Sequence, residues 1–299
     1  MTGAAPVRDR ICLVTGATSG IGFETALGLA RRGARVGLVG RDAARTRDAV
    51  GTIQAAVPGA QVDAFVADLS AQAEIRRLAG EVRALYPRLD VLVNNAGAIF
   101  DSHRLTEDGI ERTWALDHLA YVCLTLELLD LLKASAPSRI VNVASAAHTR
   151  GRIAFDDIGH ARGFSAMTVY SQAKLGNVLF TKALARRLDG TGVTVNALHP
   201  GVIASGFAAG TGGWFGFGWR LIRPFMASPV AGAATSIHVA SAPELAGVTG
   251  LYFARSRPVV TSRRAADPDL QERVWHLSLD QLGLPSTAAS SGAVGTGPV

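Results

Sequence analysis

The chain has 299 residues, 48% of them hydrophobic and 18% charged, which suits one large α/β domain or at most two small ones and excludes a disordered protein. The formal net charge of +6 comes from arginine, because only three of the 30 basic residues are lysines. No stretch alternates basic with aromatic residues, and no helix-turn-helix or zinc-finger spacing occurs. We therefore expect no nucleic-acid partner.

Two cysteines, Cys12 and Cys123, each lie in an apolar stretch. We expect buried free thiols, with neither a disulfide framework nor a metal site. Residues 1–10 contain no hydrophobic segment, and no apolar run is long enough to span a membrane. These features predict a cytoplasmic location with no signal peptide and no membrane span.

Strand and helix patterns alternate along the chain from its first residues. Strands are predicted at residues 11–15, 34–39, 62–66, 89–93, 139–144, 193–198 and 250–253. Helices are predicted at residues 26–32, 41–57, 71–86, 109–133, 168–188 and 230–240. This alternation predicts right-handed βαβ crossovers and a doubly wound parallel sheet of about seven strands, with helices on both faces.

A glycine-rich turn lies between the first predicted strand and the first predicted helix. Gly16, Gly20 and Gly22 would let the chain turn sharply and bring backbone N–H groups close to a pyrophosphate. A tight turn without a ligand is the alternative, but the position at the start of a βαβ unit favours a dinucleotide site and a Rossmann fold. The remaining candidate residues of this turn are Thr18, Ser19 and Ile21.

The residues after the second strand decide the type of cofactor. A carboxylate there suits the free 2′-hydroxyl of NAD, and a cation suits the 2′-phosphate of NADP. The sequence has Arg41 followed by Asp42, and Asp42 is also a good helix N-cap. We therefore expect NADP on Arg41, while NAD held by Asp42 stays possible.

Small and polar residues follow the third and fourth strands. Asp68, with Leu69 beside it, could accept the adenine amino group, could cap the helix that follows, or could do both. Asn95, Ala96 and Gly97 would let the chain run close under a ribose. Asn95 could also tie strands together, and the sequence does not separate these roles.

Three residues form the candidate catalytic group. Tyr170 and Lys174 are four residues apart on one predicted helix, so they share a face. A lysine cation beside a phenol favours the phenolate, so that the tyrosine can exchange a proton near neutral pH. Ser145 follows a strand end, where α/β sheets place ligands, and its hydroxyl can hold the reacting oxygen.

Together these motifs resemble the short-chain dehydrogenase/reductase family, over one Rossmann domain of residues 8–284; residues 285–299 read as a disordered tail. The resemblance implies that Tyr170 is the general acid/base, that Ser145 positions the substrate oxygen, and that Lys174 binds the nicotinamide ribose and lowers the pKa of the tyrosine. It also implies that Val202 backs the nicotinamide. The other residues implied to border the cofactor are Pro200, Gly201 and Ser205, the last standing where the family usually has threonine.

A narrower resemblance is to the retinol-dehydrogenase-like branch, which includes the WW-domain oxidoreductase-like proteins. It rests on residues 139–145 with Ala147 and His148, on residues 170–175, and on segments near 228–233 and 250–253. That branch implies NADP and a lipophilic alcohol or carbonyl substrate. The family also implies a homodimer or homotetramer built through the helices predicted at 109–133 and 168–188.

One position departs from the family pattern. Asp117 stands where the family usually has an asparagine that holds a proton-relay water near the lysine. An ionised aspartate cannot donate the same hydrogen bond. It could pair with Lys174 or disrupt the relay, so we include Asp117 among the catalytic candidates and expect altered proton transfer.

Residues 204–218 are rich in glycine and aromatic residues. They could form a mobile lid over an apolar substrate, or a connecting, membrane-facing or partner-facing loop. The leading functional hypothesis is an NADP-dependent alcohol dehydrogenase or carbonyl reductase. The alternatives are a nucleotide-bound sensor or scaffold with little catalysis and, less well matched in chain length, a sugar-nucleotide reductase or isomerase.

Overall fold

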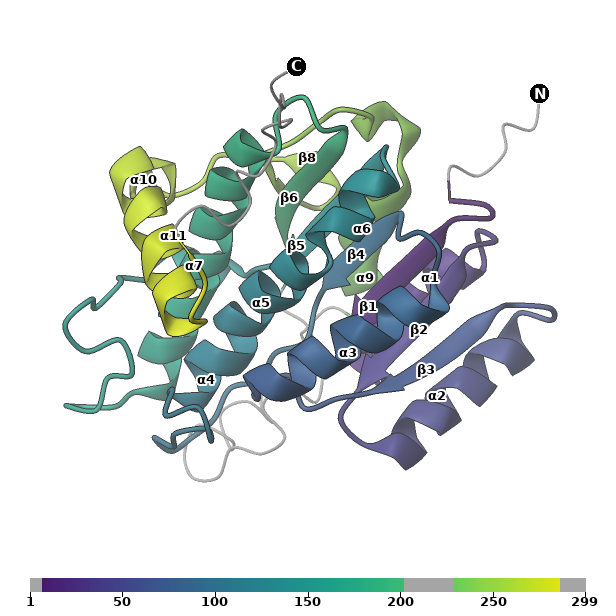
Figure 1. Cartoon of the computed structure of the whole chain (residues 1–299). Coiled ribbons are helices and arrows are strands. Elements are labelled where there is room, and N and C mark those ends of the chain that lie inside the picture. The colour runs from purple at the N-terminus through teal and green to yellow at the C-terminus, as the bar shows by residue number, and fades with distance from the viewer. Residues whose placement is uncertain (1–6, 202–227, 286–299) are drawn as a thin grey trace, which may run out of the picture.

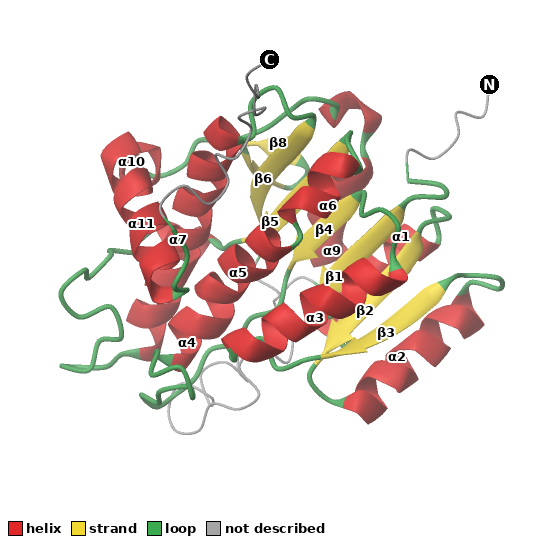
Figure 2. Ribbon diagram, viewed as in Figure 1, coloured by secondary structure: helices red, strands yellow, loops and turns green. Residues whose placement is uncertain are grey.

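The computed structural model describes residues 7–201 and 228–285, which form an eight-stranded sheet in the order β3-β2-β1-β4-β5-β6-β7-β8 (Figures 1 and 2). Strands β1 to β7 pair in parallel, and the short β8 pairs antiparallel with β7. The strands are β1 Ile11–Thr15, β2 Arg35–Gly40, β3 Val62–Val66, β4 Val91–Asn94, β5 Ser138–Val143, β6 Val193–His199, β7 Tyr252–Ala254 and β8 Arg257–Pro258. The strand order reverses between β1 and β4, which is where doubly wound sheets bind ligands.

Helices cover both faces of this sheet, so its strands are apolar on both sides (Figure 1). The helices α1 Gly20–Ala30, α2 Ala43–Ala56 and α9 Pro229–Ser241 pack on one face. The helices α3 Gln72–Leu85, α5 Ala120–Glu127, α6 Leu129–Ala134 and α7 Ala166–Arg187 pack on the other. The doubly wound parallel architecture is therefore confirmed.

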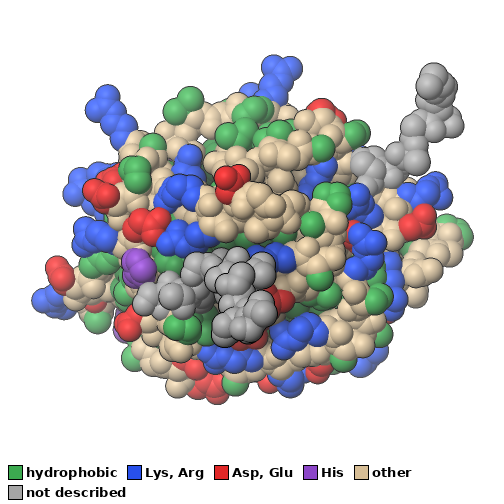
Figure 3. Space-filling view, turned by 45° about the horizontal axis from the view of Figure 1, so that its top comes forward, with side chains coloured by type: hydrophobic (Ala, Val, Ile, Leu, Met, Phe, Trp, Pro, Cys, Tyr) green, Lys and Arg blue, Asp and Glu red, His purple; other side chains and the backbone are tan. Residues whose placement is uncertain are grey.

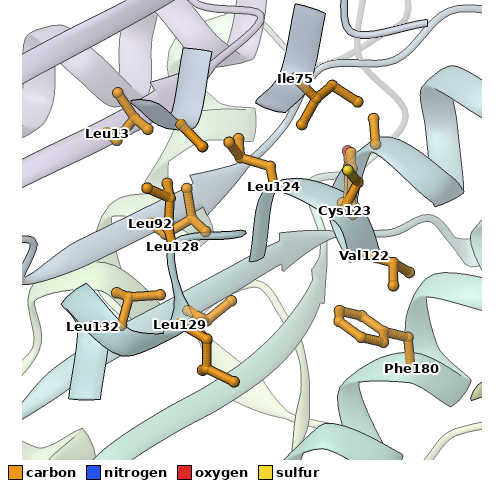
Figure 4. Close-up of a cluster of buried hydrophobic side chains, with 14 of the residues drawn as sticks. Leu13, Ile75, Leu92, Val122, Cys123, Leu124, Leu128, Leu129, Leu132 and Phe180 are labelled. Carbon is orange, nitrogen blue, oxygen red and sulfur yellow. The ribbon is translucent and has the colours of Figure 1, made fainter. Parts of the chain in front are cut away.

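Helix α3 shows how the sequence produces this layering. Its buried residues, Ile75, Leu78, Ala79 and Val82, recur at helical spacing and form one apolar stripe. Figure 4 shows Ile75 in the same cluster as leucines from β1, β4, α5 and α6. Polar and charged side chains occupy the opposite face of α3, so the helix can pack in only one orientation.

The prediction of one continuous helix at residues 109–133 is wrong. The structure has a short helix, α4 Arg112–Trp114, then a π-helical turn at Ala115–Leu119, and then α5 and α6 with a break at Leu128. The side chain of Glu111 caps α4 by accepting from the backbone N–H of Trp114. The π-helical turn matters for function because it contains Asp117, and such turns are frequent at functional sites.

Two helices near the C-terminal end were not among the predicted elements: α10 Arg263–Ala266 and α11 Pro268–Gln281. Helix α11 packs on α7, where Trp275 stacks on Phe180 with ring centroids 5.7 Å apart. Gln281 also accepts from the indole N–H of Trp114 at 2.8 Å. Helix α11 thus covers part of the surfaces near 109–133 and 168–188 within one chain, and the homodimer or homotetramer expected through these helices stays a prediction.

Figure 3 shows basic side chains spread over the visible face with acidic side chains among them, and not gathered in one patch. In the part of the chain that the structure describes, no helix combines the length and hydropathy needed to cross a membrane. Residues 1–6 and most of the tail predicted at 285–299 lie outside the described ranges, as does the 204–218 segment.

Candidate active site

A cavity of about 940 Å³ opens at the carboxyl ends of β1 to β6. It brings together the predicted site residues from six separate strand ends, within the volume range typical of ligand pockets. The predicted residues that line it are Gly16, Thr18, Ser19, Gly20, Ile21, Gly22, Arg41, Asp68, Leu69, Asn95, Ala96, Gly97, Ser145, Tyr170, Lys174, Pro200 and Gly201. Val202 and Ser205 lie outside the described residues.

The glycine-rich turn has the geometry that a pyrophosphate requires. Gly16 and Gly20 have φ of 64° and 59°, values that favour glycine. A Cβ on Gly22 would lie 2.3 Å from the carbonyl oxygen of Gly16, so no side chain fits there. Ser19 precedes α1 without capping it through its side chain, which leaves first-turn N–H groups available to an anion. These residues fit a dinucleotide.

The adenine end of the cavity carries two arginines. Arg41 follows β2 and Arg45 lies on the first turn of α2, and both line the cavity. Asp42 caps α2, because its Oδ1 accepts from the backbone N–H of Arg45 at 2.8 Å. Sequence reasoning did not single out Arg45, although its spacing of four residues from Arg41 on a helix start was a usable signal.

The structure tests one of the two possible roles of Asp68 and one of the two possible roles of Asn95. The Oδ1 of Asp68 accepts from the backbone N–H and the hydroxyl of Ser70, at 2.9 and 2.7 Å. The cap of α3 is Ala71, so the proposal that Asp68 caps that helix is wrong. The amide of Asn95 donates to the carbonyl oxygen of Thr15 at 2.9 Å, so its role in tying strand ends together is confirmed.

The candidate catalytic side chains meet at the end of β5. Tyr170 and Lys174 lie on α7 and are 8% and 3% exposed, and the ammonium of Lys174 is 5.6 Å from the centre of the Tyr170 ring. Lys174 donates to the carbonyl oxygen of Val143 at 3.3 Å. The Oγ of Ser145 accepts from the backbone N–H of Ala147 at 3.2 Å, which fixes it at the strand end. The arrangement can hold an oxygen and move a proton to or from it.

The side chains around Tyr170 do not give the lowered pKa that the family resemblance implies. Burial raises the pKa of Tyr170, a hydrogen bond with Ser145 lowers it, and the carboxylate of Asp117 and Tyr252 add to the increase. The largest cause is burial of the phenol, and the carboxylate of Asp117 adds to it. The positive charge of Lys174 has a buried negative partner.

That partner is Asp117, whose predicted pairing with Lys174 is present in the structure. The carboxylate Oδ2 lies 3.3 Å from Nζ of Lys174, and both side chains are buried. Oδ1 accepts from the backbone N–H of Ala98 at 2.9 Å. Burial raises the pKa of Asp117 to about 6 despite the opposing effect of Lys174. Asp117 is not among the residues that line the cavity, so it acts from behind Lys174.

His148 is a residue that sequence reasoning noted but gave no role. Its Nδ1 lies 2.8 Å from the carbonyl oxygen of Ser145, so this nitrogen must carry the hydrogen and donate it. Its ring packs 4.7 Å from the ring of Tyr252 on β7. The ring is buried, which lowers its pKa. His148 thereby holds the turn after Ser145 against the sheet, and its place three residues beyond that serine was the available signal.

Comparison with known proteins gives consistent results. The model of the short chain dehydrogenase family matches residues 10–214. Mouse retinol dehydrogenase 12 is 40% identical over 278 residues, covering 93% of this chain and 88% of that protein. Human retinol dehydrogenase 13 is 40% identical over 290 residues, covering 94% of this chain and 86% of that protein.

Two solved structures share the fold. The crystal structure of an uncharacterized protein from Mycobacterium paratuberculosis superposes with a TM-score of 0.77 at 32% identity, covering 94% of this chain and 96% of that one. An active-site complex of RhlG with NADP from Pseudomonas aeruginosa superposes with a TM-score of 0.68 at 28% identity, covering 85% and 97%.

Proposed function

Because the chain belongs to the short-chain dehydrogenase family and is an NAD(P)-dependent oxidoreductase, we propose that it interconverts an alcohol and a carbonyl compound with NADP. The observation that carries this proposal is a single cavity with a phosphate-binding turn at one end and Ser145, Tyr170 and Lys174 at the other. This arrangement fits a reaction in which one end of a long cofactor is anchored and the other end reacts.

The chain's own residues supply the proton chemistry. The bound nicotinamide would supply or accept the hydride. Ser145 and Tyr170 hold the substrate oxygen, and in reduction the Tyr170 hydroxyl gives that oxygen its proton as the carbonyl carbon gains the hydride. Lys174 is anchored on the carbonyl oxygen of Val143, where its charge faces the tyrosine ring. In the oxidation direction the same proton returns to Tyr170.

Arg41 and Arg45 support the choice of NADP over NAD. Both residues line the cavity, Arg41 directly after β2 and Arg45 on the first turn of α2, where the 2′-phosphate would bind. One carboxylate oxygen of Asp42 is already engaged in the cap of α2. Arginine matches phosphate in charge and geometry. The NADP in the RhlG complex is consistent with this assignment.

We propose a lipophilic small molecule as substrate, with no nucleic-acid partner, and a cytoplasmic location. The similarity to retinol dehydrogenases supports a substrate of this class. The described wall beside Tyr170 is partly apolar, with Leu116 and the 39%-exposed Met167 lining the cavity. Two free, buried thiols are what a reducing compartment preserves.

The test is a titration with NADPH followed by turnover assays on a panel of lipophilic and short-chain aldehydes and ketones. The proposal expects saturable NADPH binding and carbonyl-dependent NADPH oxidation, fastest with the lipophilic members. Tight NADPH binding without turnover across the whole panel would instead favour the sensor or scaffold hypothesis. Failure to bind either nicotinamide cofactor would contradict both.

A further inference from the structure

The buried ion pair of Asp117 and Lys174 lies outside what the proposed reaction itself requires. Asp117 is fully buried and Lys174 is 3% exposed, with 3.3 Å between Oδ2 and Nζ. A buried ion pair is a weak source of stability, because desolvating the two charges costs about as much as their attraction returns. Its location beside Lys174, whose Nζ is 5.6 Å from the centre of the Tyr170 ring, therefore points to a role in the chemistry.

The carboxylate is held so that it cannot turn away from the lysine. Oδ1 accepts from the backbone N–H of Ala98, and the carbonyl oxygen of Asp117 accepts from the side-chain amide of Asn177 at 2.8 Å. A Cβ on Gly97 would lie 2.9 Å from Oδ2 of Asp117 and 3.3 Å from Nζ of Lys174. The absence of a side chain at Gly97 thus leaves room for the two charges to meet.

Charged and titratable groups reach this pair from several elements. Lys174 and Tyr170 come from α7, Tyr121 from α5, Glu111 from the residue before α4, and Tyr252 faces Tyr170 from β7. The tyrosines are neutral at physiological pH, because burial raises the pKa of each. Lys174 is the cation in this group, and Asp117 is the carboxylate nearest to it.

We infer that Asp117 is a positioning residue that acts through Lys174: its carboxylate offsets the lysine charge, so that Tyr170 stays protonated and ready to donate to a carbonyl oxygen at neutral and mildly alkaline pH. An ammonium beside a phenol favours the phenolate, and pairing that ammonium with a carboxylate removes much of the effect. The inference rests on the proposed function, because it concerns the pH range in which Tyr170 carries the proton for carbonyl reduction.

Asp117 can offset the charge of Lys174 only while its own carboxylate is ionised. Because the pKa of Asp117 is raised to about 6, the carboxylate is ionised above that pH and takes up a proton below it. Above pH 6 the pair is neutral overall and Tyr170 remains a phenol. Below pH 6 Lys174 loses its counter-ion, but the acidity of the solution then keeps Tyr170 protonated. The consequence of Asp117 is therefore visible on the alkaline side.

The decisive variant is Asp117→Asn, which keeps an oxygen to accept from Ala98 and removes the charge. Asp117→Ala is a second variant, which removes the same charge together with the polar side chain. Asp130→Asn is the matched control, because Asp130 is an exposed aspartate on α6 away from the cavity. Circular dichroism and thermal unfolding establish that each variant is folded before it is compared.

The first measurement follows the ionisation of Tyr170 without any turnover. The protein carries four tyrosines, so 13Cζ-labelled tyrosine gives a countable set of signals, and Tyr170→Phe assigns the one of interest. We expect the midpoint for Tyr170 to fall by about one pH unit in Asp117→Asn, which is tenfold in the ionisation constant. The Asp130→Asn midpoint should equal that of the wild type.

The second measurement is kcat/KM for carbonyl reduction at saturating NADPH, followed from pH 7 to as far above pH 10 as the protein stays folded, because the pKa of Tyr170 is raised. The alkaline limb, where the rate falls as Tyr170 loses its proton, should move to lower pH in Asp117→Asn by the same amount. Unchanged Tyr170 midpoints in the folded variants would overturn the inference, even if the enzyme is active. A shifted midpoint in a protein that reduces no carbonyl would support the inference about Asp117 and contradict the proposed function instead.

Discussion

Tyr170 differs from phenylalanine by one oxygen atom, and the proposed reaction depends on that atom. Tyr170→Phe should lower kcat for carbonyl reduction by about 10²- to 10⁴-fold, the usual contribution of general acid catalysis. NADPH affinity should change little, because the phosphate-binding turn is untouched. Stopped-flow or steady-state assays of NADPH oxidation, with fluorescence titration of NADPH, measure the two quantities.

Tyr86→Phe is the matched control for the loss of a buried hydroxyl. Tyr86 donates to Asp63 at 2.8 Å, in the core beyond the cavity. This variant should lose stability while keeping kcat. Equal losses of kcat in both variants would show that Tyr170 has only a structural role.

Arg41 should set the preference for NADPH over NADH. Removing one charge-assisted contact to a phosphate costs about 1.5–3 kcal/mol, so Arg41→Ala should lower the ratio of the two kcat/KM values by about 10- to 100-fold. The exposed Arg47 lies on α2, just after Arg41, and does not line the cavity, so Arg47→Ala should leave the ratio unchanged. An unchanged ratio in Arg41→Ala would remove Arg41 from the cofactor site.

Single residues were predictable from sequence where the chemistry is local. The tyrosine, the lysine and the glycines follow from spacing, and the pairing of Asp117 with Lys174 was one of two outcomes that the sequence allowed. The effect of Asp117 on the pKa of Tyr170, which opposes that of Lys174, was not predictable. It depends on burial and on the distance between two elements that are far apart in the sequence. His148 was missed as a positioning residue although its contact with Ser145 is local; only its contact with Ser262, 114 residues away, depends on the fold.

The π-helical turn at Ala115–Leu119 connects three elements through His118. The Nδ1 of His118 lies 3.1 Å from Oδ1 of Asn177 on α7, and its Nε2 lies 2.9 Å from the hydroxyl of Ser278 on α11. The side-chain oxygen of Asn177 only accepts, so Nδ1 carries a hydrogen. The Ser278 hydroxyl donates to the carbonyl oxygen of Val274 at 2.8 Å and lies beside Nε2 as a polar neighbour. Burial lowers the pKa of the ring to about 4, so the ring is neutral at physiological pH.

Acid should weaken the fold at this turn. The unfolded imidazole binds a proton below pH 6.5, whereas the folded one does so only near pH 4, so the unfolded state takes up more protons between these values. Stability should fall as the pH drops through this window, by about 3 kcal/mol from His118 at most. Urea unfolding at pH 7.5 and pH 5 measures the change.

His118→Gln should be less stable at neutral pH but should show a smaller loss on acidification. His276→Gln is the control, since His276 lies exposed on α11. If His118→Gln loses as much stability on acidification as the wild type, other groups cause the pH dependence.

For helices and strands, the sequence predicted the elements themselves better than the junctions between them. The seven parallel strands follow from apolar runs that recur between helices, and the register of β1 to β6 places their ends together. The π-helical turn was not predictable, because residues 109–133 have a continuous helical pattern and the extra residue is stabilised by Asn177 of another helix. Helix α11 was missed although its start carries a usable signal, the N-cap Asp267 followed by Pro268.

For the whole molecule, α11 bears on how many chains associate. Residues 120–125 of α5 and most of α7 are buried within one chain, and α11 lies over α7. We therefore predict that the homodimer or homotetramer implied by the family resemblance forms through surfaces that α11 leaves uncovered. Analytical ultracentrifugation over a range of micromolar concentrations tests this, and sedimentation with the mass of a single chain at every concentration would contradict it.

The contact of Ser278 with His118 also has a consequence for synthesis. His118 is adjacent to Asp117, so the last described helix supports the turn that carries the counter-ion of Lys174. A nascent chain that has not yet emerged to residue 281 has its nucleotide-binding turn and Tyr170. It lacks α11, the helix that supports the π-helical turn carrying Asp117. The catalytic centre therefore matures last, and activity reports that translation has passed through α11.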